Sequence, residues 1–176
     1  MHRATVAPTG VERHLGPDEL IVSKTDAKGV ITYANPVFCR MAALTEEQLL
    51  GRPHNVIRHP DMPRAVFKLL WDTIASGREI FAYVNNLAAD GANYWVFAHV
   101  TASYDAAGRL TGYHSNRRAP DPAAIAAVRG VYATLLERER RQASAADGLA
   151  ASTALLESTL AGAGMSYDEW VWAVTP

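Results

Sequence analysis

An irregular stretch, Asn55-Val56-Ile57-Arg58-His59-Pro60-Asp61-Met62-Pro63, divides the first two thirds of the chain into two differently patterned parts. Three prolines fall between residues 52 and 63. Because proline fixes φ and removes a backbone donor, this region cannot be one long helix or strand. We expect it to be a loop that joins the elements before it to those after it.

The residues before this loop predict a hairpin followed by two short helices. Residues 20–25 and 30–33 read as strands, and Asp26-Ala27-Lys28-Gly29 between them has turn chemistry, with a glycine that can take positive φ. Capping signals then start short helices over residues 35–43 and 45–51.

The residues after the loop predict one longer helix and three strands. Residues 63–76 carry apolar side chains at helical spacing. Strands are expected over residues 79–87, 93–103 and 109–117, with glycine-containing turns between them. Neither face of the middle strand is polar, so we expect both faces to be covered. Strands at both ends with helices between them indicate an α+β domain with an antiparallel sheet.

Two flanking segments extend this domain, which we expect to span residues 20–120. Residues 1–19 are interpreted as a leader or cap with one short helical piece, and residues 121–176 as a helical extension for dimerisation or partner docking. The extension begins with an apolar stripe that serves an interface or packs back on its own sheet: Ile125, Val128, Tyr132 and Leu135. Its terminal aromatic residues are expected to be exposed: Tyr167, Trp170 and Trp172.

Composition excludes several classes of protein. The 176 residues have a formal net charge of -1, so no basic field indicates nucleic-acid binding. No run of about 18 apolar residues predicts a membrane span, and the N-terminus lacks the apolar core of a signal peptide. We therefore expect a cytoplasmic protein. Cys39 is the single cysteine, which excludes an internal disulfide and is compatible with a reducing compartment.

The central loop resembles the PAS domain of bacterial aerotaxis and energy-taxis receptors. The resemblance is carried by Arg58-His59-Pro60-Asp61-Met62-Pro63 together with Tyr33-Ala34-Asn35, Phe67, Trp71, Asn86 and Tyr94-Trp95-Val96, and it covers residues 20–118. It implies a five-stranded antiparallel sheet with short helices on one face. It also implies non-covalent FAD and a sensor that reports redox or oxygen status to a chemotaxis signalling partner.

The resemblance also implies which residues hold the flavin. Six positions match residues associated with the flavin pocket of that family: Asn35, Arg58, His59, Asp61, Trp71 and Asn86. The sequence departs from many relatives at the start of the third strand, where a tryptophan is replaced by Glu79-Ile80-Phe81-Ala82. Stacking on the flavin from this strand then comes from Phe81 or Tyr83, or is absent.

The chemistry of these side chains suits FAD, and each also has a structural interpretation. Arg58 offers a planar fork of donors to phosphate or ribose, and Trp71 can stack on an aromatic ring. Asn86 offers both a donor and an acceptor to the flavin edge. Alternatively, Asn35 is a helix cap, an Arg58–Asp61 ion pair stabilises the loop, and Trp71 belongs to the core.

Three other functions remain open from the sequence. A haem-binding gas sensor of the same fold has His59, His99 and His114 as conceivable axial ligands. A cofactor-free PAS module would serve dimerisation only. A flavoenzyme ranks last because we find no set of acid, base and nucleophile, and we expect no catalytic activity. Since the sequence ends at Pro176 without a membrane anchor or long signalling helix, we expect a homodimer, a separate chemoreceptor or another signalling partner.

Overall fold

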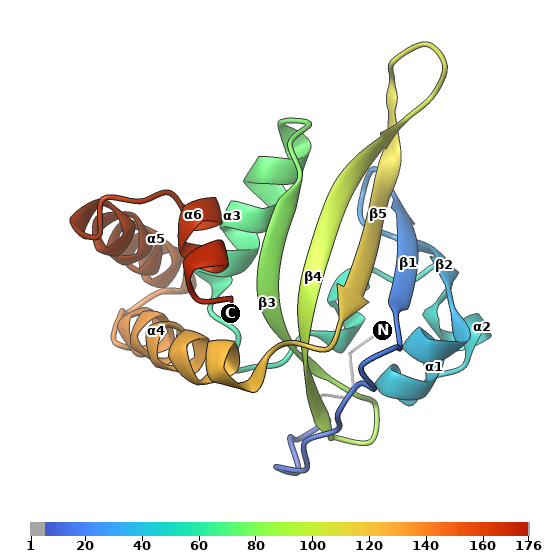
Figure 1. Cartoon of the computed structure of the whole chain (residues 1–176), viewed down its shortest axis with the longest axis horizontal. Helices are drawn as coiled ribbons and strands as arrows, with labels where there is room; N and C mark the ends of the chain where they lie inside the picture. The colour runs from blue at the N-terminus through green and yellow to red at the C-terminus, as the bar shows by residue number, and fades with distance from the viewer. Residues whose placement is uncertain (1–5, 176) are drawn as a thin grey trace.

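A computed structural model describes residues 6–175 and contains one five-stranded sheet (Figure 1). The strands are β1 (Ile21–Asp26), β2 (Ile31–Ala34), β3 (Ile80–Leu87), β4 (Asn93–Tyr104) and β5 (Leu110–Arg118). They lie in the order β2-β1-β5-β4-β3, and all neighbouring pairs are antiparallel. The expected α+β fold with a five-stranded antiparallel sheet is confirmed.

Local sequence signals account for the hairpin and the short helices. Gly29 ends the β1–β2 turn with φ 78°, a left-handed conformation that glycine adopts at little cost. The Asn35 side chain accepts a hydrogen bond from the Phe38 N–H and caps α1 (Pro36–Ala42). A complete capping box between Thr45 and Gln48 starts α2 (Glu46–Leu49).

The proline-rich region between residues 52 and 63 is irregular, as expected, and positions the longest helix of the domain. It contains only one short 3₁₀ helix, η1 (His54–Ile57), before α3 (Arg64–Ala75) begins. Pro63 precedes α3 and supplies no side-chain cap to it. The apolar stripe of α3 is buried against the sheet through Val66, Leu70 and Ile74. The sheet therefore has an inner face, which η1 and α3 cover.

The C-terminal extension forms three helices beside β3: α4 (Pro122–Arg140), α5 (Ala145–Gly162) and α6 (Tyr167–Ala173) (Figure 1). The predicted stripe is buried within the chain, since Ile125, Val128, Tyr132 and Leu135 are each at most 7% exposed. The Tyr132 hydroxyl donates to the Tyr83 carbonyl oxygen at 2.9 Å. The stripe is thus buried inside the chain, with Tyr132 against β3 and β4, and does not form an open dimer seam.

The terminal aromatic residues pack on the outer face of the sheet. Trp172 lies 4.9 Å from Phe81 and 5.6 Å from Phe97, between ring centroids. Trp172 is 47% exposed, but Trp170 is partly buried against the core and Tyr167 is only 7% exposed, so the expectation of exposure is confirmed for Trp172 alone. Both faces of β3 and β4 are consequently covered, as predicted, by η1 and α3 on one side and by α4 and α6 on the other.

Residues 6–19 run along the end of the sheet. Residues Thr9, Val11 and Arg13 exchange backbone hydrogen bonds with Gly91 and Asn93. No helix occurs within residues 6–19, so the expected helical piece is not found there, and residues 1–5 lie outside the described residues. Across residues 6–175, no helix combines the length and the apolar character needed to cross a membrane.

Candidate functional site

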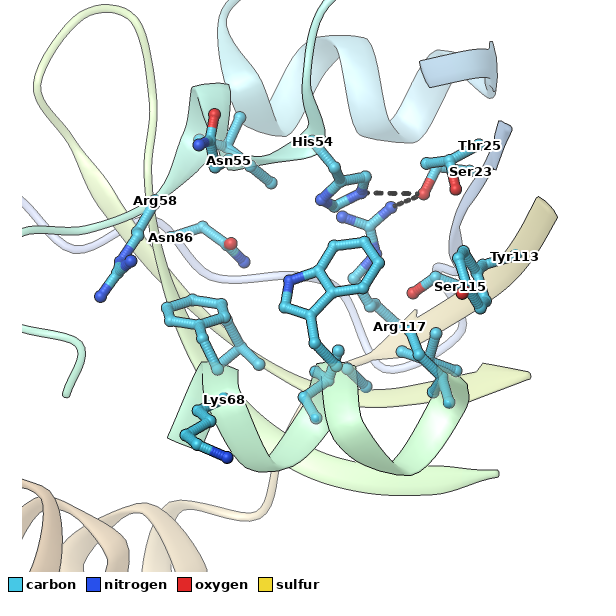
Figure 2. A pocket seen from close by; sticks show the side chains of 18 of the residues that line it. Ser23, Thr25, His54, Asn55, Arg58, Lys68, Asn86, Tyr113, Ser115 and Arg117 are labelled. Atoms are coloured by element: carbon cyan, nitrogen blue, oxygen red, sulfur yellow. Dashed lines mark hydrogen bonds between the residues drawn. The ribbon is translucent and has the colours of Figure 1, made fainter. Parts of the chain in front are cut away.

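A cavity of about 350 Å³ lies between the inner face of the sheet and the cover of η1 and α3 (Figure 2). This volume is at the small end of the range for ligand pockets, about 300–1,000 Å³. Alternate residues of four strands face it, because side chains on a strand alternate between faces. The strand residues that line it are Ser23, Thr25, Val84, Asn86, Ala98, Val100, Tyr113, Ser115 and Arg117.

The most unusual of these residues is Arg117. It is 3% exposed and makes no ion pair with any carboxylate in the described part of the chain. Its Nη2 donates to Ser23 Oγ at 2.5 Å, and its guanidinium lies over the Phe38 ring at 4.4 Å. Its Nε and Nη1 have no hydrogen-bond partner within residues 6–175. Burial lowers the pKa of Arg117 to about 10, so it stays charged at neutral pH. An uncompensated buried charge is costly, so this geometry favours an anionic or strongly accepting ligand.

Ser23 connects Arg117 to His54 on η1. Ser23 Oγ lies 3.1 Å from His54 Nε2, and the two dashed contacts in Figure 2 converge on this hydroxyl. Desolvation, followed by the charge of Arg117, lowers the pKa of His54 to about 3. His54 is therefore neutral near pH 7, and the Ser23 hydroxyl accepts from Arg117 and is free to donate to the imidazole.

Two further polar groups of the cavity wall have no partner among the described residues. Asn86 is 4% exposed and its Nδ2 makes no hydrogen bond, and the Thr25 Oγ1 is also unpaired. Buried polar groups are normally hydrogen-bonded, and each exception calls for a bound ligand or water. Together with Arg117, they provide donors from β1, β3 and β5 to one apolar-walled cavity.

Cationic side chains gather at another part of the cavity wall. Arg58, Arg64 and Lys68 line it, and Figure 2 shows Arg58 and Lys68 away from the group of Ser23, His54 and Arg117. The Arg58 guanidinium lies 4.4 Å from the centroid of the Phe67 ring. Lys68 is also ion-paired to Asp72 on the surface of α3. The cavity thus has a buried polar end and a more open basic end.

Three of the residues implied by the family resemblance lie together in this cavity: Arg58, Trp71 and Asn86. Arg58 and Asn86 also form an isolated antiparallel β-bridge. Trp71 packs edge-on against Tyr113, with 5.5 Å between ring centroids, and remains 39% exposed. A Cβ at Gly29 would lie 2.7 Å from the Trp71 ring, so the β1–β2 turn packs closely against the indole.

The other three residues have structural partners outside the cavity lining. Asn35 caps α1, accepts from the Val22 N–H and donates to the Leu20 carbonyl, so its amide joins α1 to β1. His59 is 5% exposed, and its Nδ1 accepts from the Asp61 N–H at 3.1 Å. Desolvation lowers the pKa of His59. The Asp61 carboxylate is exposed and pairs with Arg140 of α4 at 2.8 Å, instead of holding Arg58.

Phe81 and Tyr83 lie on the outer face of β3 and cannot stack on a ligand in the inner cavity. Phe81 stacks on His99 at 4.2 Å, and the Tyr83 hydroxyl lies 2.6 Å from Thr175 Oγ1 beyond α6. The sequence analysis missed Ser23, His54 and Arg117. The signal that could have found Arg117 is its alternation with Tyr113 and Ser115 on an inward-facing strand.

The histidines considered as haem ligands do not line this cavity. His59 belongs to the loop, His99 pairs with Glu79 at 2.7 Å on the outer face, and His114 lies between the inward-facing Tyr113 and Ser115. Cys39, on α1, does not line the cavity either. Burial raises the pKa of its thiol.

Comparison with known proteins agrees with this architecture. Residues 31–116 match the family described as PAS fold. The aerotaxis receptor of Escherichia coli (strain K12) is 37% identical over 121 residues, which cover 69% of this chain and 24% of the receptor. A nitrogen fixation regulatory protein of Klebsiella pneumoniae is 32% identical over 97 residues, covering 55% of this chain and 20% of that protein. The chain therefore spans a quarter or less of these curated relatives.

Solved structures with the same fold include a light-oxygen-voltage domain reported with a flavin analogue. It superposes with a TM-score of 0.55 and 17% sequence identity, over 62% of this chain and 82% of that one. At this level of identity the match concerns the fold. With the family match, the sequence relatives and the order of the strands in agreement, the chain contains a PAS domain related to those of the aerotaxis receptor and the nitrogen fixation regulatory protein.

Proposed function

We propose that the cavity binds a flavin, FAD, non-covalently and that the chain is a redox or oxygen sensor without catalytic turnover. The observation that carries this proposal is Arg117, a buried cation whose Nε and Nη1 have no partner in a cavity with mostly apolar walls. Apolar walls can pack against a flat apolar ring system, and the unpaired N–H groups can donate hydrogen bonds to acceptors on one polar edge of that ring system.

The residues present fit the ring system of a flavin. Phe67, Trp71 and Tyr113 supply aromatic surface to the cavity. Arg117 and the Asn86 amide supply N–H donors for the carbonyl and nitrogen atoms of the ring edge. A flavin supplies reversible uptake of electrons and protons when it is bound. A cation at its edge stabilises the negative charge that reduction adds, so Arg117 raises the reduction potential of the bound ring.

The basic end of the cavity supports a dinucleotide. A volume of about 350 Å³ holds a fused ring system but not a whole FAD. The diphosphate of FAD would therefore lie near the opening, next to Arg58 and to the ends of Arg64 and Lys68, which are ion-paired to Glu139 and Asp72. This distribution of charge favours FAD over a neutral ligand of the same ring size.

The alternative functions have less support. None of His59, His99 and His114 lines the cavity, and His54, which does line it, has its Nε2 engaged with Ser23 Oγ; both observations weaken the haem hypothesis. The helical stripe that suggested a cofactor-free dimerisation module is occupied within the chain. Ser23 and His54 are hydrogen-bonded as in some hydrolases, but Arg117 donates to the same serine oxygen, which disfavours its use as a nucleophile.

We further propose that the sensor acts in the cytoplasm on a separate signalling protein, or on a second copy of itself. The names of its relatives, an aerotaxis receptor and a regulator of nitrogen fixation, support a signalling partner. The single cysteine, Cys39, is compatible with a reducing compartment. Light scattering over a range of protein concentrations tests for the second copy, because a mass that stays monomeric contradicts it.

The absorption spectrum of the purified full chain tests the ligand. We expect flavin bands, and release of FAD on denaturation. If the protein is purified without ligand, titration with FAD should restore the bands, with FMN as the matched control that lacks the adenylate half. A haem spectrum, or a protein that takes up no flavin from solution, contradicts the proposal.

A further inference from the structure

Helix α3 forms one wall of the cavity, but its own sequence leaves its N-terminus uncapped. Arg64, Phe67, Lys68 and Trp71 of α3 all line the cavity. The residue before the helix, Pro63, has no side chain that can accept a hydrogen bond, and the first turn contains no acidic residue. The free N–H groups at the start of a helix require acceptors from elsewhere.

A carboxylate of the C-terminal extension supplies the missing cap. Glu139 of α4 is 5% exposed, and its Oε1 accepts from the Ala65 N–H at 3.1 Å. The same oxygen accepts from Ser152 Oγ of α5 at 2.8 Å, and Oε2 accepts from Arg64 Nε at 3.2 Å. One buried side chain thus joins α3, α4 and α5, and its negative charge lies at the positive end of the α3 dipole.

The extension also contributes directly to the cavity wall. Leu149 of α5 lines the cavity together with Arg64 of α3. The residue before it, Gly148, is packed against the backbone of α4 at Glu139. A Cβ at position 148 would lie 2.7 Å from the Glu139 carbonyl oxygen and 2.9 Å from Arg64 Nη2. The position of Leu149 in the wall therefore depends on a glycine contact and on the Glu139 cap.

A second contact fixes the loop that leads into α3. Asp61 pairs with Arg140, the residue that follows Glu139, at 2.8 Å. This pair is exposed and contributes little on its own. It lies three residues from Arg58, which lines the cavity, so α4 contacts the loop on the cavity's border as well as the start of α3.

We propose that the C-terminal extension is part of the ligand site: Glu139 positions α3, Leu149 closes one wall, and ligand binding and docking of the extension stabilise each other. The inference rests on the proposed FAD function and adds the way in which the site is linked to residues 121–176. Linkage between two such events is reciprocal, so a ligand that needs the docked extension also holds it in place.

The test uses full-length variants that loosen the extension without removing cavity atoms. Gly148→Ala places a methyl group against the Glu139 carbonyl, and Glu139→Ala removes the cap of α3. Gly130→Ala is the matched glycine control, because a Cβ there meets nothing within 4 Å. Glu137→Gln is the acidic control, since Glu137 pairs only with the exposed Arg141 on the same helix. Glu139→Gln keeps one acceptor oxygen and should be intermediate.

Affinity for FAD and hydrogen exchange are measured together. We expect Gly148→Ala and Glu139→Ala to bind FAD about 5- to 150-fold more weakly, the usual range of coupling between two sites. Both controls should bind like the parent. In the parent, FAD should slow amide exchange in α5 and in the first turn of α3, and a merely structural role of Glu139 predicts no such ligand dependence.

The outcomes separate the two proposals. A parent that takes up no FAD overturns the proposed function, and this inference with it. A parent that binds FAD, but shows no change of exchange in α5, overturns this inference alone, even if a variant fails to fold. Equal FAD affinity in the parent, Gly148→Ala and Glu139→Ala overturns it as well.

Discussion

The two faces of the sheet are built from the same strands, yet they differ in how their polar groups are satisfied. On the outer face, the Tyr83 hydroxyl meets Thr175, the Tyr83 carbonyl accepts from Tyr132, and His99 meets Glu79. On the inner face, polar atoms of Thr25, Asn86 and Arg117 have no partner in the described part of the chain. Among the described residues the outer face leaves one buried side-chain atom unpaired, Trp95 Nε1, whereas the inner face leaves several around one cavity, which calls for a bound ligand or water. Substitutions on each face, measured for both stability and FAD affinity, test this comparison.

The largest expected effect is a loss of stability on the outer face. Phe97 is 4% exposed and packs against Tyr83, Phe81 and Trp172. Phe97→Ala should lower the free energy of unfolding by about 3–5 kcal/mol, the usual cost of truncating a buried phenylalanine. Urea denaturation measures it. FAD affinity, measured where the variant is still folded, should stay close to that of the parent, and a parallel loss of affinity would show that the faces are not independent.

On the inner face, Arg117→Met should change binding and stability in opposite directions. Truncating one member of a buried, hydrogen-bonded charge pair typically costs about 2–5 kcal/mol of binding free energy. FAD affinity should therefore fall by at least about 30-fold. The protein without ligand should become more stable, because methionine replaces an unpaired buried cation. FAD titration and a thermal melt without FAD measure the two effects. A variant that is less stable and binds FAD normally would assign Arg117 to the core.

Arg58 tests the basic end of the cavity. Arg58→Ala should remain folded and lose about 1.5–3 kcal/mol of FAD affinity, the value of a hydrogen bond to a charged group. The effect on FMN should be smaller, since Arg58 is expected to contact the half of FAD that FMN lacks. Arg52→Ala is a suitable control, because Arg52 is exposed and does not line the cavity. FAD affinity equal to the parent's means that the loop around Arg58 is structural.

The smallest effect concerns pH and His54. Its folded pKa of about 3 lies below the ordinary value of 6.5, so the unfolded chain binds the proton more readily. The contribution of neutral His54 to the free energy of unfolding is therefore fully present above pH 6.5 and is lost as pH falls toward 3. Between pH 6.5 and 5 this residue should account for about 2 kcal/mol, at 1.36 kcal/mol per pH unit. Urea denaturation of His54→Gln should show a shallower dependence on pH in this window, and an unchanged slope contradicts the assignment.

Much of the fold could be predicted because its signals are local. The turn at Gly29, the Thr45 capping box and the helical spacing of residues 63–76 each lie within one element, and all three predictions are confirmed. The family resemblance led to Arg58, Trp71 and Asn86, because their neighbours in the sequence are distinctive.

The rest of the site could not be predicted because it is assembled across the sheet. Ser23 and Arg117 are separated by 94 positions and meet only through the pairing of β1 with β5. The partner of Asp61 is equally remote in sequence, since Arg140 is 79 positions away on α4. Phe81 and Tyr83 were assigned to the flavin through their type, whereas the pleat of β3 turns them to the opposite face.

The position of β3 at the edge of the sheet has a consequence for solubility. Its sequence, Ile80-Phe81-Ala82-Tyr83-Val84-Asn85-Asn86-Leu87, contains no charge and no proline. Such a strand is a template for aggregation when its edge is bare. Here three contacts engage backbone groups along the strand. The Tyr83 carbonyl accepts from the Tyr132 hydroxyl, the Asn85 N–H donates to the sulfur of Met62, and Asn86 forms a β-bridge with Arg58. A partner that draws α4 away from the sheet removes the Tyr132 contact, so it must cover that part of the strand itself to keep the chain from self-association.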